Sequence, residues 1–277
     1  TIMTKVGVYA ILRVNGTVFD DELSHKILQD WLLPIGLITS LYGVIGAIGA
    51  ERLRRFVGFM MLSSIGTILI AISMLNTQAW SAALYYLVHS TLIAAAFYLL
   101  CGWITSQRGA FKDHFNIAPQ MKQHKVLAIT YFMIALMMAG LPPFSGFLGK
   151  VFILQATANM AHQGWIIGII LLVSLLSIIA FTRVGFILFW RATKPEDDIQ
   201  TKAYDEYQTL PAIAPPRNDR VIYLLLTGLV LYVVFANPIQ QYMLNTAQQI
   251  QHNAAYEALI LKKDRTGNVI SVQPYDP

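Results

Sequence analysis

Three protonatable side chains stand inside long apolar stretches of the sequence. Lys5 lies in Thr-Lys-Val-Gly-Val-Tyr-Ala, His89 in Leu-Tyr-Tyr-Leu-Val-His-Ser-Thr-Leu, and Lys150 ends Gly-Leu-Pro-Pro-Phe-Ser-Gly-Phe-Leu-Gly-Lys. A charge at the centre of a membrane helix costs about 3 kcal/mol, so such residues face a protein interior or a hydrated path. An amine or imidazole held there can accept and release protons. These residues are therefore candidates for proton translocation.

A helix break is predicted beside Lys150. Pro142 and Pro143 remove backbone donors and clash with the preceding turn, while Gly140 and Gly146 weaken the helix further. Because apolar residues flank this segment on both sides, we expect a broken helix at 140–150 in the middle of the membrane. Such breaks in transporters line hydrated cavities with freed carbonyl groups. The alternative is a kinked, packed helix whose lysine extends to the membrane surface.

Other polar residues in apolar sequence are secondary candidates. Arg183 lies seven residues before Trp190, close enough to the end of its stretch to favour a structural role. Ser63 and Ser64 indicate close helix packing, although their hydroxyls can also hold water. Tyr85 lies one turn before His89 and offers a hydroxyl to a proton path. A buried histidine bonded to a backbone carbonyl is the alternative explanation of His89.

Hydrophobic helices must position these residues. Of the 277 residues 56% are hydrophobic and only 13% are charged, against roughly 25% charged in soluble domains. Apolar stretches of about 20 residues or more can each cross the hydrocarbon layer of a bilayer. They cover 32–50, 56–75, 79–104, 126–157, 165–190 and 221–235 with its flanks. The sequence predicts an all-α integral membrane protein with six complete transmembrane helices and a partial one.

The predicted segments follow the chain in order. They are the remnant of a truncated transmembrane helix (1–14), five transmembrane helices (32–192), a cytoplasmic loop (193–220), a final transmembrane helix (221–245) and a polar tail (246–277). Alternate connections differ in their Lys and Arg content, and basic residues mark the cytoplasmic side. The richer side holds Arg52, Arg54, Arg55, Arg108, Lys112, Lys122, Lys125, Arg191, Lys194, Lys202, Arg217 and Arg220. The tail is therefore predicted to be extracytoplasmic.

Composition also argues against several kinds of site. Cys101 is the only cysteine, so the chain cannot build a disulfide, an iron–sulfur cluster or a thiolate zinc site. His89 has no carboxylate or second histidine near it in sequence, which makes it a poor metal ligand. The net charge of +5 comes from residues at the ends of apolar stretches, not from a nucleic-acid-binding patch. We expect no cofactor, no metal and no nucleic-acid partner.

Taken in order, these segments resemble the antiporter-like subunits shared by respiratory complex I and the Mrp/Pha multisubunit monovalent cation/proton antiporters. The segments of Lys5 and His89 are similar to the family's eighth and eleventh helices, and 141–150 is similar to its broken twelfth helix. Arg183 and the following Phe-Trp-Arg resemble the thirteenth. The resemblance is closest to the D subunit of the Mrp/Pha antiporters. One departure is Ile93, which stands where many relatives carry a lysine four residues after the histidine.

The resemblance implies a fourteen-helix fold with two inverted repeats. This chain would hold the second repeat, the last helix and a stub of the first half, without the family's glutamate–lysine pair on the fifth and seventh helices. It would be a secondary-transporter subunit and not an enzyme, in a bacterial plasma membrane. Its partners would be the lipid bilayer, other antiporter subunits, protons and Na⁺ or K⁺, with Lys5, His89 and Lys150 forming the proton path.

Two further functions fit the same helices. One is a proton-pumping membrane subunit of an NADH:quinone oxidoreductase or a hydrogenase complex. The other is a structural scaffold in which the buried lysines only join helices. The sequence does not rank Na⁺ against K⁺, because it shows neither a carbonyl-lined filter nor a carboxylate cage.

Overall fold

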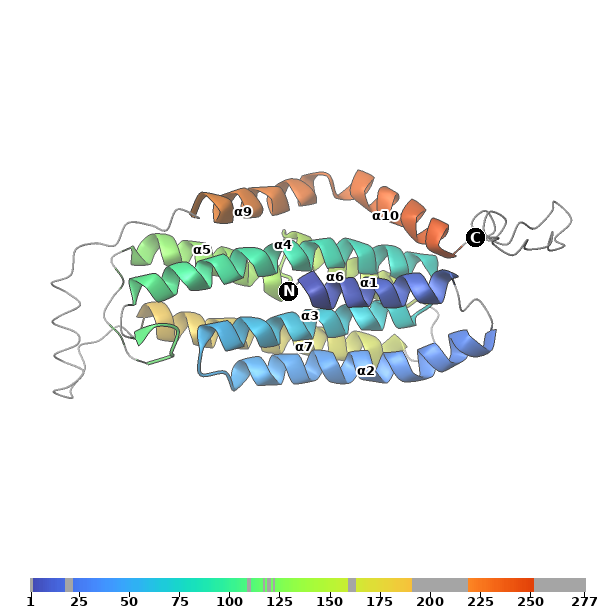
Figure 1. Ribbon diagram of the computed structural model, residues 1–277, viewed down its shortest axis with the longest axis horizontal. Coiled ribbons are helices and arrows are strands. Elements are labelled where there is room, and N and C mark those ends of the chain that lie inside the picture. Colours follow the sequence, from blue (N-terminus) through green and yellow to red (C-terminus); the bar gives the residue numbers. More distant parts are fainter. Residues whose placement is uncertain are drawn as a thin grey trace, which may run out of the picture.

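The structure, a computed structural model, describes residues 2–17, 22–108, 111–116, 118, 121, 123–158, 163–190 and 219–251. In these residues it contains helices and no strand beyond an isolated bridge between Arg52 and His114. The helices are α1 (Ile2–Thr17), α2 (Glu22–Ile48), α3 (Leu53–Ser73), α4 (Thr77–Gln107), α5 (His124–Ala139), α6 (Ser145–Ala156), α7 (Gln163–Gly185) with its π-helical end η2 (Phe186–Trp190), α9 (Asp219–Val234) and α10 (Ala236–Gln251). Figure 1 shows them as a bundle that shares one long axis, with α9 and α10 along one side of α4.

The membrane-spanning capacity agrees with the predicted fold class in outline. Four helical stretches are long and apolar enough to cross a membrane, and a fifth is counted if the bent pair of α9 and α10 forms one span. The four are Lys26–Ile48, Leu53–Ser73, Thr77–Gln107 and Gln163–Trp190. The apolar stretch over 126–157 is divided between α5 and α6, which are too short to be counted singly.

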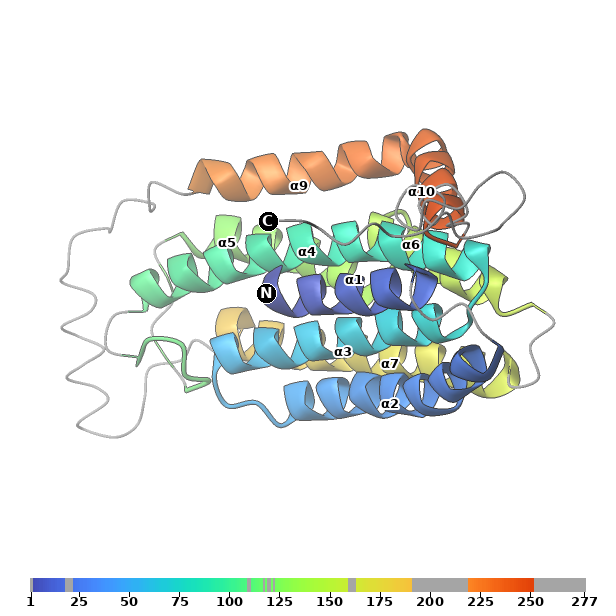
Figure 2. The same ribbon diagram turned by 45° about the vertical axis from the view of Figure 1, so that its right-hand side comes forward.

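The last predicted helix differs from the expectation of a single element over 221–245. Its two parts, α9 and α10, are bent by 81° relative to each other. Pro238 lies in the first turn of α10, where it has no N–H to continue the ladder into α9. The bend keeps both helices against α4, as Figures 1 and 2 show from two directions. The predicted tail beyond Gln251, and all but the last two residues of the predicted loop over 193–220, lie outside the described residues.

Basic residues gather at one end of the bundle. The turn from α2 to α3, the end of α4 and the start of α9 lie together at the left of Figure 1. This end carries Arg52, Arg54, Arg55, Arg108, Lys112, Lys125 and Arg220. At the opposite end, the turn from α3 to α4 has no Lys or Arg. The bundle is therefore polarised along its axis, as the counting of charges in the sequence predicts.

The apolar core is divided into two clusters along the axis. The first, nearer the basic end, is built around Phe56, Phe97, Tyr131 and Phe181. The second surrounds Ile68, Trp80 and Ile153 in the other half. Buried polar residues occupy the helices between the two clusters: Ser40, Ser63, Ser64, Thr67, His89, Ser90, Ser145, Lys150 and Ser177. We call these residues the polar layer, and a layer of this kind lowers the cost of holding charge deep in the bundle.

Candidate functional site

The break between α5 and α6 forms the centre of the site. Gly140 ends α5 in the left-handed conformation, with φ of +82°, and its N–H donates to Leu136 O over 3.2 Å. Glycine adopts this conformation without the steric penalty that other residues meet. The chain then runs through Pro142 and Pro143 before α6 begins at Ser145. The interruption lies where the sequence predicts it, and it leaves main-chain carbonyls at the end of α5 available to other groups.

Lys150 folds back onto this break. Its Nζ donates a hydrogen bond of 2.7 Å to the carbonyl of Ala139 and one of 2.9 Å to Ser174 Oγ on α7. A Cβ at Gly140 would lie 3.0 Å from Nζ, so glycine is needed there for space as well as for its conformation. The ammonium group therefore lies between the end of α5 and the middle of α7 and does not reach the surface, since only 7% of the residue is exposed.

His89 contacts the same break from α4. Its Nδ1 and Ser145 Oγ are 2.8 Å apart, and only 1% of the residue is exposed. A Cβ at Gly146 would lie 2.9 Å from His89 Nε2, so α6 approaches the ring as closely as a glycine allows. Ile93 leaves the histidine without the lysine partner expected for the family. The structure supplies Ser145 in its place.

Lys5 lies on α1, against the face of α4 that carries Leu87 and Thr91. It is 3% exposed, and within the described part of the chain its Nζ has no hydrogen-bond partner. A cavity of about 240 Å³ opens beside it, lined by Lys5, Val6, Tyr9, Leu87 and Thr91. The ammonium groups of Lys5 and Lys150 both lie within electrostatic reach of the His89 ring. The structure thus brings the three primary candidates into one region of the polar layer.

The secondary candidates take different places. Arg183 lies apart from the break and donates a hydrogen bond of 2.7 Å to Ile48 O, at the end of α2. Ser63 and Ser64 lie on α3 at the level of the polar layer, and a Cβ at Gly43 would be only 2.3 Å from Ser63 N. Arg183 therefore joins two helices, whereas the serines belong both to the polar layer and to a close contact with α2. The hydroxyl of Tyr85 is buried without a hydrogen-bond partner among the described residues.

Sequence reasoning missed two residues that complete the site. Ser145 directly follows Pro-Pro-Phe in the predicted break, so its position carried a usable signal. Ser174 is one of several serines in an apolar helix, and its spacing does not single it out. Each serine binds a different candidate residue, and the two bonds connect α4, α6 and α7 at one level.

A comparison with protein families matches this arrangement to a known group. The family model described as "NADH:quinone oxidoreductase/Mrp antiporter, TM" matches residues 1–179, which include Lys5, His89, the break and Lys150. The chain belongs to this family. Its all-helical architecture and apolar helices are those of an integral membrane protein.

Curated relatives in the family are D subunits of antiporters. The chain is 27% identical over 299 residues to that of a probable K(+)/H(+) antiporter of Rhizobium meliloti, covering 96% of this chain and 52% of the relative. It is 32% identical over 196 residues to that of the Na(+)/H(+) antiporter of Bacillus subtilis, covering 70% of this chain and 38% of the relative. The chain thus spans about half, or less, of the length of the curated relatives it matches.

A solved structure shows the same fold. The Mrp complex from Dietzia sp. contains a chain that superimposes with a TM-score of 0.72 at 21% identity, over 91% of this chain and 52% of that one. At this identity the likeness establishes the arrangement of helices. The roles of individual residues rest on their geometry in this chain.

Proposed function

We propose that this chain carries proton translocation in a subunit of a monovalent cation/proton antiporter. Lys5, His89 and Lys150 are the groups that take up and release the proton, and Ser145 and Ser174 position two of them. The observation that carries this proposal is the shared break, because the segment between Ala139 and Ser145 contacts both Lys150 and His89. Two proton-exchanging groups are thereby linked through a few residues of irregular backbone.

The chemistry of the site suits proton transfer better than cation binding. Lys150 donates to a carbonyl and a hydroxyl, both neutral, so no carboxylate fixes its charge. Around the break, the hydrogen-bonding groups of the described residues are hydroxyls, a ring nitrogen and carbonyls, all of which can bond a water molecule. A lysine without a fixed counterion can alternate between its charged and neutral forms as water reaches it.

The names of the relatives favour antiport with Na⁺ or K⁺ as the second ion. The curated relatives are named for K⁺/H⁺ and Na⁺/H⁺ antiport, and we propose that other subunits of such a complex are this chain's partners. The basic end of the bundle would face the cytoplasm of a bacterial cell, and the end of α10 would face outward. Because the matching family also contains subunits of NADH:quinone oxidoreductases, a redox-driven pump is the competing function.

The test removes the charge of Lys150 while keeping its volume. Lys150→Met in the full-length subunit should reduce cation-dependent proton exchange in everted membrane vesicles to background, because methionine fills the space and carries no proton. Lys26→Met is the matched control, since Lys26 is an exposed lysine on α2, and it should leave exchange unchanged. Co-purification of the partner subunits verifies assembly of both variants.

The same variant separates the competing functions. Normal assembly with normal exchange in Lys150→Met would contradict the proposal and favour a scaffold, in which an apolar residue of similar size replaces the lysine without loss. Quinone-linked NADH oxidation by the purified complex would favour the redox-driven pump, whereas exchange driven only by ion gradients would support the antiporter.

A further inference from the structure

A stripe of polar side chains follows one face of α4 from the polar layer to the non-basic end of the bundle. Thr77, Ser81, Tyr85 and His89 recur at every fourth residue, a spacing that keeps neighbouring members on one side of a helix. We call these four residues the α4 stripe. From Thr77 to His89 the stripe covers about 18 Å along the helix axis. It therefore passes beside the second apolar cluster, which otherwise fills this half of the bundle.

Each member of the α4 stripe contacts a polar group of another helix. Thr77 Oγ1 donates to the amide oxygen of Gln251, and Gln240 Nε2 donates to Ser81 Oγ over 2.9 Å. The hydroxyl of Tyr232 donates to the carbonyl of Tyr85 over 3.2 Å, and the two rings lie 4.6 Å apart. At the last position, Ser145 bonds His89. Three of the four partners belong to α9 and α10, which the bend at Pro238 holds against α4.

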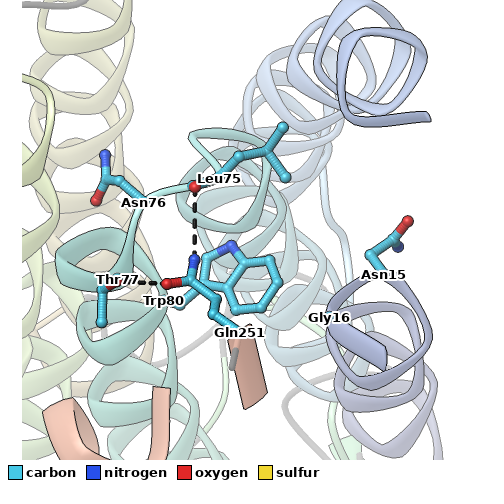
Figure 3. Close-up of a pocket in the computed structure, with 7 residues that line it drawn as sticks. All are labelled: Asn15, Gly16, Leu75, Asn76, Thr77, Trp80 and Gln251. Carbon is cyan, nitrogen blue, oxygen red and sulfur yellow. Dashed lines mark hydrogen bonds between the residues drawn. The ribbon is translucent and has the colours of Figure 1, made fainter. Parts of the chain in front are cut away.

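The outer end of the stripe opens into a pocket of about 310 Å³. It is lined by Asn15, Gly16, Leu75, Asn76, Thr77, Trp80 and Gln251. Figure 3 shows the Gln251 amide at the centre of this pocket, bonded to Thr77 and to the carbonyl of Leu75, above the Trp80 indole. Amide, hydroxyl and carbonyl groups supply its polar lining, and the space is large enough for several water molecules.

Two buried polar atoms of the stripe and its partners lack a hydrogen-bonding group among the described residues. They are the Tyr85 hydroxyl and the Gln240 amide oxygen, and each is shielded from bulk solvent. An unsatisfied buried polar group is costly, and a bound water molecule is the usual way in which proteins satisfy one. Successive stripe residues are about 6 Å apart along the axis, which is the length of two hydrogen bonds in line and so leaves room for one bridging water.

We infer that the α4 stripe and its partners on α9 and α10 hold a file of water that connects His89 with the pocket at Gln251, so that protons pass between the polar layer and this end of the bundle by that route. The inference rests on the proposed function for its proton traffic, but the presence of water along the stripe can be measured without any transport. It assigns a positioning role to Ser81 and Gln240, which the proposed path through Lys5, His89 and Lys150 does not include.

Water along the stripe can be tested with an introduced thiol. N-ethylmaleimide reacts with the thiolate, which forms only where water reaches the sulfur. In the intact complex, Ser81→Cys should be labelled at least roughly tenfold faster than Ala83→Cys, which lies on the opposite face of α4 and is equally buried. The native Cys101, fully buried in the first cluster, serves as an unreactive reference in the same peptide digest. Equal labelling at positions 81 and 83 would overturn the inference, whether or not the complex transports ions.

Proton flow along the stripe is tested by a neighbouring pair of glutamines. Gln240→Leu removes the bond to Ser81 with little change in volume and should slow cation-dependent proton exchange about tenfold, the effect of one lost hydrogen bond on a rate. Gln241→Leu, at an exposed position one residue later, should not slow it. Normal exchange in Gln240→Leu would show that protons take another route, even if Lys150→Met has confirmed the proposed function.

Discussion

Gly146 is the position at which one added methyl group should uncouple His89 from the break. A Cβ at this residue would lie 2.1 Å from Met137 O, which is 0.9 Å inside the 3.0 Å limit that real Cβ contacts respect. The obstacle is backbone, so α6 must withdraw by about 0.9 Å in Gly146→Ala. A shift of that size along the His89–Ser145 bond would lengthen it from 2.8 Å to about 3.7 Å, beyond hydrogen-bonding range.

The expected cost has two parts. Overpacking of this kind destabilises a core by about 1–3 kcal/mol. Loss of the hydrogen bond adds about 1 kcal/mol and should slow a step that depends on it roughly tenfold or less. Cation-dependent proton exchange should therefore fall clearly in Gly146→Ala while the subunit still assembles.

The assay is proton exchange in everted vesicles, normalised to the amount of assembled subunit. Gly168→Ala is the matched control, because a Cβ at Gly168 meets nothing within 4 Å and alanine favours a helix over glycine. It should leave exchange unchanged and hold or raise thermal stability. If Gly146→Ala assembles normally and exchanges protons at the wild-type rate, the close contact between α6 and His89 has no functional role, and the reasoning is refuted.

Two further substitutions test the structural roles assigned above. Arg183→Ala should lower thermal stability by about 1 kcal/mol through loss of the bond to Ile48 O and should leave exchange per assembled subunit unchanged; a loss of exchange at normal stability would return Arg183 to the proton path. Gly43→Leu should prevent assembly, because the side chain would meet the backbone of Ser63, whereas Gly7→Ala, with nothing within 4 Å, should assemble normally. A stable, assembled Gly43→Leu would contradict the close packing of α2 on α3.

Much of the fold follows from the sequence because local properties decide it. Apolar stretches long enough to cross a bilayer predict helices, and these lie close to the observed α2, α3, α4 and α7. Two prolines within a few residues of two glycines predict the interruption between α5 and α6, since no helix can supply the missing N–H groups. The gathering of basic residues at one end could also be counted from the sequence alone.

The bend between α9 and α10 was missed even though Pro238 was visible. Residues 221–245 contain enough apolar residues to suggest one final helix, and a proline near a helix start is compatible with a helix that begins there. Whether the helix ends or continues depends on its packing against α4, which length and hydropathy do not report.

The sequence by itself determined which residues carry charge into the apolar part of this protein: Lys5, His89 and Lys150 stand out because ionisable groups are costly there. Only the tertiary structure decided what each of them touches. Ser145 replaces the partner that Ile93 cannot provide, Ser174 meets Lys150 from another helix, and Gln240 meets Ser81 across 159 residues of sequence. Hydrogen bonds of about 3 Å between helices depend on their separation and rotation, and those are set by the packing of the whole bundle.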